Sequence, residues 1–160
     1  MLAELAALPA GASPLCHQPP DCFHSEACEP RFFESRGAHI ERLVGHLRSA
    51  LLTGCDQLER GHVVFIDSAR RYLGDAAIGA GNHASLVIQP REILAAGFKL
   101  GASGMILAHN HPSGECRPSE VDIIATKRLA WLGEMVDLLL LDHLIITASQ
   151  VYSMRAGSLL

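Results

Sequence analysis

Two histidines one residue apart, His109 and His111, are followed by Asp122 in the stretch 109-HNHPSGECRPSEVD-122. If the histidines lie on an extended segment, their spacing puts both rings on the same side of the strand, and Asn110 points to the other side. The first turn of a following helix would bring Asp122 back toward the two rings. Two imidazoles and one carboxylate form a three-ligand set that catalytic zinc uses, with the fourth position left for water.

The chemistry that such a site supports is hydrolysis. Zinc lowers the pKa of a bound water to about 7 and polarises a carbonyl, and amide hydrolysis needs both effects. Simpler interpretations exist, since a His-x-His pair is common by chance and Pro112-Ser113-Gly114 needs nothing beyond turn chemistry. The letters HNH do not indicate an HNH nuclease, because the three residues of that motif are scattered across a ββα metal fold.

Ser119 and Asp122 also have a purely structural interpretation as the start of a helix. A serine at the N-cap accepts a hydrogen bond from the backbone, and an aspartate at the third helical position interacts favourably with the helix dipole. The pattern predicts a helix after Ser119 with an apolar face of Ile123, Ile124, Leu129 and Leu132.

The elements that must position these residues are predicted from apolar periodicity and turn residues. A helix is expected from about residue 37 to near Gly54, with the apolar positions Ile40, Leu43, Val44, Leu47 and Leu51. A second helix is expected to begin at Pro90 and run to about Leu100.

Several segments are predicted to be strands. They are Val63–Ile66 with its hairpin partner Tyr72–Ile78, Leu86–Ile88, Gly104–Ala108 with His109 at its C-terminal end, Leu138–Ile146 as one strand or two interrupted at Asp142-His143, and an edge strand at Val151–Ser153. Strands and helices are mixed without strict βαβ repetition. We therefore predict an α/β sandwich in which helices flank a mixed, mostly antiparallel sheet.

Length and composition indicate one globular domain with an extension. The chain has 160 residues, of which 49% are hydrophobic and 19% charged. Residues 1–35 lack a sustained period and are predicted to be a flexible or loosely docked extension, with the domain at 36–160. The apolar run 138-LLLL-141 is too short to span a bilayer, and the N-terminus lacks the basic start of a secretory signal. We expect a cytoplasmic protein without membrane contact.

The net charge of −4 comes from the extension, which holds one basic and five acidic residues of the 13 and 17 in the chain. The remaining 125 residues carry 12 of each sign. A protein that depends on phosphate contacts usually has a basic excess, so the charge does not support nucleic-acid binding.

Five cysteines, an odd number, do not indicate a disulfide framework. Cys16, Cys22 and Cys28 are interleaved with His17 and His24, but the five-residue gaps differ from the short gaps of zinc knuckles. We expect reduced thiols in the extension and no metal role for Cys116.

The spacing His-x-His, seven residues, Ser, two residues, Asp is the signature of the JAB/JAMM (MPN-type) zinc metalloprotease domain, and His109, His111, Ser119 and Asp122 meet it at every position. The letters HNHPSG, the upstream PREI at 90–93 and the downstream LDHLIIT at 141–147 resemble the bacterial RadC-like branch. The resemblance covers the chain from about residue 37 to the C-terminus, and it implies a JAB/MPN, cytidine-deaminase-like, three-layer architecture.

The resemblance also implies roles for residues. His109, His111 and Asp122 would hold Zn²⁺, and Ser119 would donate a hydrogen bond to the developing oxyanion. In RadC-like chains the catalytic glutamate lies eight residues before an aspartate that ends the first core strand, and counting back from Asp67 gives Glu59.

Glu92 is the competitor for the role of the catalytic base, although a first-turn helix acid explains it equally well. This chain departs from the family in having Arg60-Gly61, where an apolar pair usually follows the glutamate. The pair Asp142-His143 is typical of RadC-like chains and is expected to support the site without binding the metal.

Three functions follow from these observations. The first is a zinc metallopeptidase or isopeptidase acting on a protein or peptide. The second is a non-catalytic MPN-type interaction module, which would have no reason to keep the whole ligand set. The third is a role in DNA repair, which the family association allows and the charge does not support.

Overall fold

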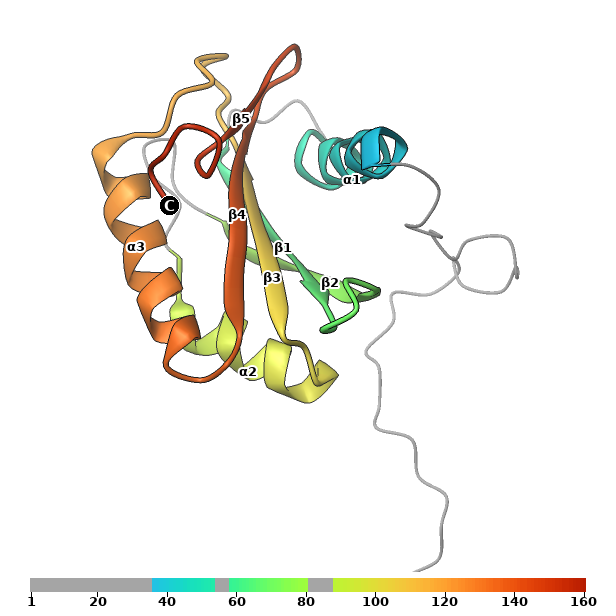
Figure 1. Cartoon of the computed structure of the whole chain (residues 1–160). Helices are drawn as coiled ribbons and strands as arrows, with labels where there is room; N and C mark the ends of the chain where they lie inside the picture. The colour runs from blue at the N-terminus through green and yellow to red at the C-terminus, as the bar shows by residue number, and fades with distance from the viewer. Residues whose placement is uncertain (1–35, 54–57, 81–87) are drawn as a thin grey trace, which may run out of the picture.

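A computed structural model of the chain describes residues 36–53, 58–80 and 88–160 (Figure 1). The predicted extension with its three cysteines lies outside the described residues, as do Leu86 and Val87 of one predicted strand. Ile88, the last residue of that predicted strand, is in neither a helix nor a strand. The boundary between extension and domain therefore stays a prediction.

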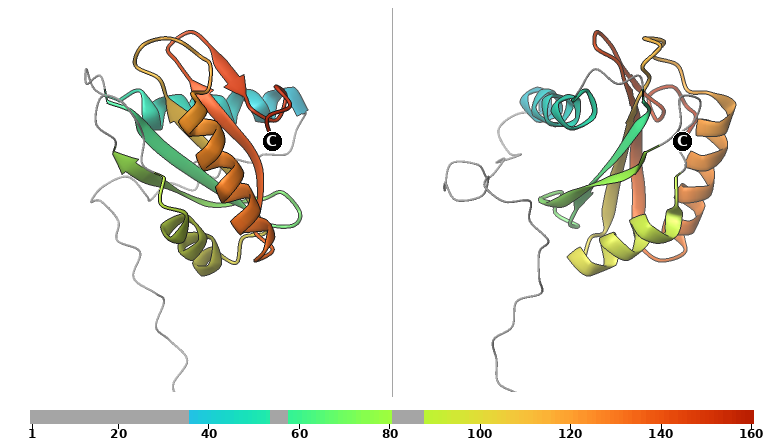
Figure 2. Two further views of the ribbon diagram at one scale, coloured as in Figure 1. Left: turned by 90° about the vertical axis from the view of Figure 1, so that its left-hand side faces the viewer. Right: turned by 180° about the vertical axis from the view of Figure 1, so that it is seen from behind.

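The described chain forms five strands and three helices. In order they are α1 (Arg36–Leu51), β1 (Arg60–Ile66), β2 (Tyr72–Ala80), α2 (Pro90–Leu100), β3 (Gly104–Asn110), α3 (Glu120–Glu134), β4 (Leu139–Ile146) and β5 (Val151–Ser153). The sheet has the order β2-β1-β3-β4-β5, in which only β3 and β4 pair in parallel. Helix α1 lies on one face and α2 and α3 lie on the other (Figures 1 and 2). The predicted α/β sandwich with a mixed, mostly antiparallel sheet is confirmed.

The helix boundaries follow from local chemistry. Pro90 opens α2 at a position where its missing N–H costs nothing, and Gly101 closes the helix with a φ of 63°, in the left-handed region that glycine adopts readily. In α1 the buried positions are Leu47 and Leu51, whereas the side chain of Ile40 is 63% exposed. The helix predicted there is correct, but Ile40 does not belong to its buried face.

The central strands are buried on both faces, which explains their continuous apolar sequences. Along β1, Val63 and Phe65 face α2 and α3, while Val64 and Ile66 face α1. The core beneath α2 and α3 is completed mainly by Ile93, Met105, Leu107, Leu129, Leu138 and Leu140.

Two sequence predictions are corrected by the structure. Strand β4 runs through Asp142 and His143 without interruption, and the irregularity is a register shift opposite Met105 and Ile106. In α3, Ile124 is 68% exposed. The other predicted positions hold, since Leu129 is buried and Ile123 and Leu132 are half-buried. The buried residues of the helix are Asp122, Thr126, Leu129 and Gly133, two of which are polar, so apolar periodicity missed part of the inward face.

Gly133 allows a tight turn between the end of α3 and the start of β4, in which the backbone N–H of Leu138 donates to the carbonyl of Gly133 at 2.9 Å. A β-carbon built at that position would stand 2.3 Å from the carbonyl oxygen of Leu138.

Among the described residues, no helix combines the length and the apolar character that a membrane crossing requires.

Candidate metal centre

The end of β3 and the first turn of α3 bring His109, His111 and Asp122 together. His109 Nε2 and His111 Nε2 are 2.9 Å apart, and the Asp122 oxygens lie 3.4 Å from the first and 3.5 Å from the second. His109 is fully buried and Asp122 nearly so. We call these three residues the α3-face cluster, because they lie on the side of the sheet that α3 covers.

Hydrogen bonds fix which nitrogen of each imidazole carries the proton. His111 Nδ1 is 2.8 Å from the backbone carbonyl of Glu115, which can only accept. Nδ1 of His111 is therefore the donor, and in the neutral ring the lone pair is on Nε2, the atom that faces His109.

A chain of three bonds fixes His109 in the same way. The Thr126 hydroxyl donates to the carbonyl of Asp122 at 2.6 Å, so its oxygen accepts from His143 Nδ1 at 2.5 Å. His143 Nε2 must then accept from His109 Nδ1 at 2.8 Å. The lone pair of His109 is thereby left on Nε2, and His109 and His111 point lone pairs at each other beside a carboxylate.

This donor set fits a tetrahedral divalent metal. With metal–ligand bonds of about 2.0–2.1 Å, zinc places its ligand atoms roughly 3.3 Å apart, close to the distances among these three residues. Two facing lone pairs and a carboxylate repel one another unless a cation or a proton lies between them. The arrangement therefore suits Zn²⁺ better than a purely structural hydrogen-bond network.

Ionisation in the cluster follows from the same contacts. Burial alone would raise the pKa of Asp122, but its contacts with the His109 and His111 rings and with Ser119 lower it well below its usual range. A protonated His111 ring can donate through Nε2 to Asp122, and this interaction is the main cause of the raised pKa at His111. Burial lowers the pKa of His143 to about 3, which keeps that ring neutral, as the chain of bonds requires.

Ser119 forms the predicted cap and also orients Asp122. Its oxygen accepts from the backbone N–H of Asp122 at 3.2 Å, and its own N–H donates to Asp122 Oδ2 at 2.7 Å, which completes a capping box. Its hydroxyl proton is directed to the same Oδ2 at 2.6 Å. To donate to an oxyanion, as predicted from the sequence, this hydroxyl must turn away from Asp122.

A pocket of about 450 Å³ opens beside the cluster, a size typical of small-ligand sites. Its lining is mostly polar and comes from the 111–118 loop, the start of α3 and the residue before β1: Glu59, His111, Ser113, Glu115, Arg117, Pro118, Ser119, Val121 and Asp122. Of the three candidate ligands, His111 and Asp122 line the pocket, whereas His109 is buried behind them.

The two glutamates considered as the base occupy different places. Glu59 lines the pocket and lies near enough to His111 to raise its pKa by charge. Glu92 lies in the first turn of α2, with its side chain 60% exposed and 3.9 Å from Arg91. Helix α2 is near the end of the sheet opposite the 111–118 loop (Figures 1 and 2). Of the two, only Glu59 can act on a ligand in the pocket.

Asn110, the residue between the histidines, holds the segment that carries Glu59. Its side-chain oxygen accepts from the backbone N–H of Arg60 at 2.7 Å, and its amide donates to the carbonyl of Leu58 at 3.0 Å. The side chain of Asn110 is therefore hydrogen-bonded to the residues on both sides of Glu59. Nothing in the sequence pattern indicated this role, since the two segments are fifty residues apart.

Gly61 belongs to the pair Arg60-Gly61, which replaces the usual apolar pair of the family, and it lies next to the α3-face cluster. Gly61 is directly opposite His109 in the antiparallel pair of β1 and β3. Residues that face each other across such a pair project to the same side of the sheet, so Gly61 places no side chain next to the His109 ring.

Cys116, Asp142 and His143 do not contribute ligand atoms to the α3-face cluster. Cys116 is buried, and its thiol donates to the carbonyl of Ile145 at 3.1 Å. Asp142 accepts from Ser153 and from the backbone of Arg155, which anchors the C-terminal turn. Only His143 touches the cluster, and its partner Thr126 was not singled out from the sequence.

Comparison with known proteins identifies the family of the chain. The profile of the RadC-like JAB domain matches residues 39–159, which includes every described element except the first turn of α1. The chain belongs to the RadC-like JAB domain family. The matched residues include His109, His111 and Asp122.

Relatives of this RadC-like chain carry the name UPF0758 protein. That of Finegoldia magna is 38% identical over 103 residues, which is 64% of this chain and 46% of the relative. That of Flavobacterium johnsoniae is 40% identical over 57% of this chain and 40% of the relative. That of Thermosynechococcus vestitus is 33% identical over 78% and 52%. The chain spans about half the length of these relatives.

Proposed function

We propose that this chain is a zinc-dependent hydrolase of amide bonds, acting on a peptide or protein substrate. The observation that carries the proposal is the pair of imidazole lone pairs that converge with Asp122 at the wall of a pocket that Glu59 also lines. A scaffold would need neither the directed lone pairs nor the open pocket.

His109, His111 and Asp122 would hold the metal. When bound, Zn²⁺ lowers the pKa of a water to about 7 and polarises the scissile carbonyl. The chain of His143 and Thr126 holds the His109 ring in the tautomer that ligation requires. Ser119 keeps Asp122 oriented through two hydrogen bonds to Oδ2.

Glu59 is the proposed base and acid. Its carboxylate would accept a proton from the attacking water and deliver that proton to the nitrogen of the leaving amine. Ser119 would turn its hydroxyl toward the oxyanion as the carbonyl carbon becomes tetrahedral. The substrate is a peptide amide or a lysine isopeptide, since both present the same carbonyl and leaving amine.

The test combines metal analysis with isotope labelling. The purified chain is loaded with Zn²⁺ and incubated in ¹⁸O-water with a degenerate library of peptides that includes lysine isopeptides. We expect mass spectrometry to find one ¹⁸O atom in each new carboxyl group, and none with His109→Ala. A chain that takes up zinc in the cluster and labels no product would contradict the proposed function.

A further inference from the structure

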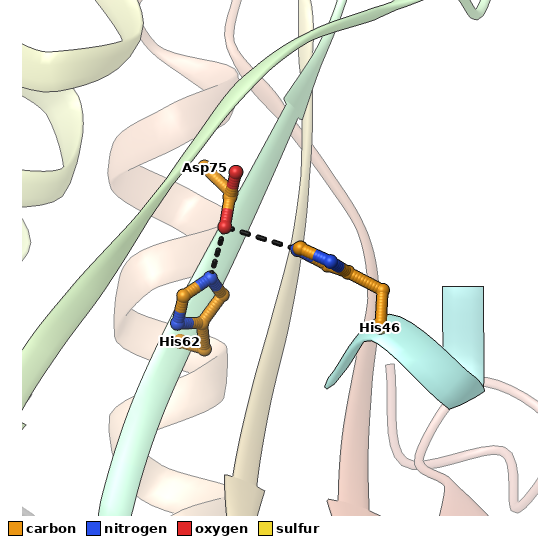
Figure 3. A group of neighbouring side chains, drawn as sticks. All are labelled: His46, His62 and Asp75. Atoms are coloured by element: carbon orange, nitrogen blue, oxygen red, sulfur yellow. Dashed lines mark hydrogen bonds and ion pairs between the residues drawn. The ribbon is translucent and has the colours of Figure 1, made fainter. Parts of the chain in front are cut away.

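A second group of two histidines and one aspartate lies on the other face of the sheet (Figure 3). His46 comes from α1, His62 from β1 and Asp75 from β2, and their potential ligand atoms all lie within 4.8 Å of one another. His46 Nε2 is 3.0 Å from Asp75 Oδ2, and His62 Nε2 contacts the same oxygen. We call these residues the α1-face cluster.

The aspartate of this cluster is oriented for the two rings. The hydroxyl of Tyr72 donates to Asp75 Oδ1, so that Oδ2 is the oxygen presented to both histidines. The hydrogen bond from His62, opposed by burial and aided by Tyr72 and His46, lowers the pKa of Asp75. The carboxylate is therefore charged at neutral pH.

The surroundings of the cluster provide both shielding and access. The side chains of His62 and Asp75 are 11% and 21% exposed, whereas that of His46 is 44% exposed. The centroids of the His46 and His62 rings are 5.9 Å apart in an edge-to-face arrangement, and the exposed side chain of His46 gives the cluster a side that solvent can reach. A cation there would keep free positions for water.

We propose that His46, His62 and Asp75 bind a divalent transition-metal cation of the zinc class, which fastens α1 to the edge of the sheet formed by β1 and β2. Imidazole nitrogens with one carboxylate oxygen suit such cations, and a hydroxyl that orients the carboxylate is a usual companion of metal ligands. On binding, each neutral ring moves its Nε2 proton to Nδ1, and a protonated ring releases one proton to solvent.

This site is separate from the α3-face cluster. His62 pairs with Ala108, the neighbour of His109, and successive residues of a strand point to opposite faces. Its ligands come from three elements, none of which provides a ligand to the other cluster. The proposal consequently does not rest on the proposed hydrolase function.

The test is the zinc stoichiometry of the full chain, measured by titration with Zn²⁺ in four forms: the parent, His46→Gln, His109→Ala and the double variant. Glutamine at 46 can still donate to Asp75 but lacks the imidazole. The cysteines of residues 1–35 add the same background to all four forms. We expect each single variant to bind one equivalent fewer than the parent, and the double variant two fewer.

His39→Gln, at a histidine two turns earlier on α1, is the matched control and should bind as many equivalents as the parent. Asp75→Asn should also lose one equivalent, which covers the case in which His46→Gln disturbs α1. Circular dichroism establishes that each variant is folded. If folded His46→Gln and Asp75→Asn both bind zinc with parental stoichiometry, the proposal is overturned.

A second readout is thermal unfolding in the His109→Ala background, where the other cluster no longer contributes. Zn²⁺ should raise the midpoint there, because a cation that binds only the folded state stabilises it. His46→Gln should abolish that rise. A rise of equal size in the double variant would assign the zinc effect to another part of the chain and overturn the proposal.

Discussion

The α3-face and α1-face clusters use the same three residue types on opposite faces of one sheet, and they differ in what surrounds them. In the α3-face cluster the ring protons are engaged elsewhere, so that the Nε2 lone pairs of His109 and His111 face inward. In the α1-face cluster the Nε2 atoms of His46 and His62 face a carboxylate oxygen, as proton donors. The two clusters therefore share their ligand types, but only in the α3-face cluster are the ring nitrogens already oriented to bind a cation.

A second difference is access to a reacting group. The α3-face cluster lies at the end of a strand, beside a pocket that also contains Glu59. The α1-face cluster lies between a helix and the edge of the sheet, and no acid beyond Asp75 belongs to it among the described residues. Residue types alone therefore suggest metal binding in both places, whereas only the α3-face cluster has the pocket and the glutamate that the proposed hydrolysis needs.

The largest effect is expected from a substitution of Glu59, the proposed base. Glu59→Gln should lower kcat by about 10²–10⁴-fold while zinc binding is retained, because general acid–base catalysis contributes that much. His46→Gln should leave kcat unchanged. Both are measured by the rate of ¹⁸O-labelled product formation, with zinc quantified in the same samples.

The control for this prediction is Glu92→Gln, which alters an exposed acid on α2. It should keep the parental rate. If Glu92→Gln abolishes the reaction and Glu59→Gln does not, Glu59 is not the base.

Substitution of Asn110 tests whether the reaction rate depends on the position of Glu59 as well as on its presence. Asn110→Ala removes the two bonds that hold Leu58 and Arg60, and a displacement of about 1 Å can cost on the order of 10²-fold in rate. The zinc content should not change. The loss of these two hydrogen bonds should also lower the free energy of unfolding by about 1–3 kcal/mol, measured by urea denaturation.

Asn110→Asp keeps the acceptor for Arg60 and loses the donor for Leu58, so its rate should fall between those of the parent and Asn110→Ala. Parental kinetics in Asn110→Ala would mean that Glu59 is positioned by other contacts.

The smallest effects are expected from substitutions of Thr126 and Tyr72, whose hydroxyl groups support the α3-face and α1-face clusters. Thr126→Val removes the acceptor of His143 and should weaken zinc binding at the α3-face cluster by about 10–100-fold, measured by competition with a chelator. Tyr72→Phe removes the donor to Asp75 and should weaken binding at the α1-face cluster by less, because water can replace a hydroxyl at a partly exposed carboxylate.

Each of these two changes should leave affinity at the other cluster unaltered. Equal losses at both clusters in either variant would show that the two sites are coupled through the sheet and are not independent.

The sequence predicted most of the fold because its signals are local. The hairpin of β1 and β2, the proline that opens α2 and the serine that caps α3 each depend on a few neighbouring residues. The prediction for α3 was wrong in the orientation of one turn. The inward face of α3 carries Thr126 and Asp122 in place of Ile124, because polar contacts with β3 and β4 outweigh apolar periodicity.

The sequence by itself also determined the α3-face cluster, because its three ligands lie within fourteen residues and strand and helix periodicity bring them together. The partners that come from elsewhere in the chain could be identified only from the tertiary structure. These are Asn110 gripping the segment of Glu59, His143 fixing the tautomer of His109, and His46 meeting His62 and Asp75 across the sheet. The physical reason is that strand pairing and helix docking set these contacts, and both depend on the packing of the whole core.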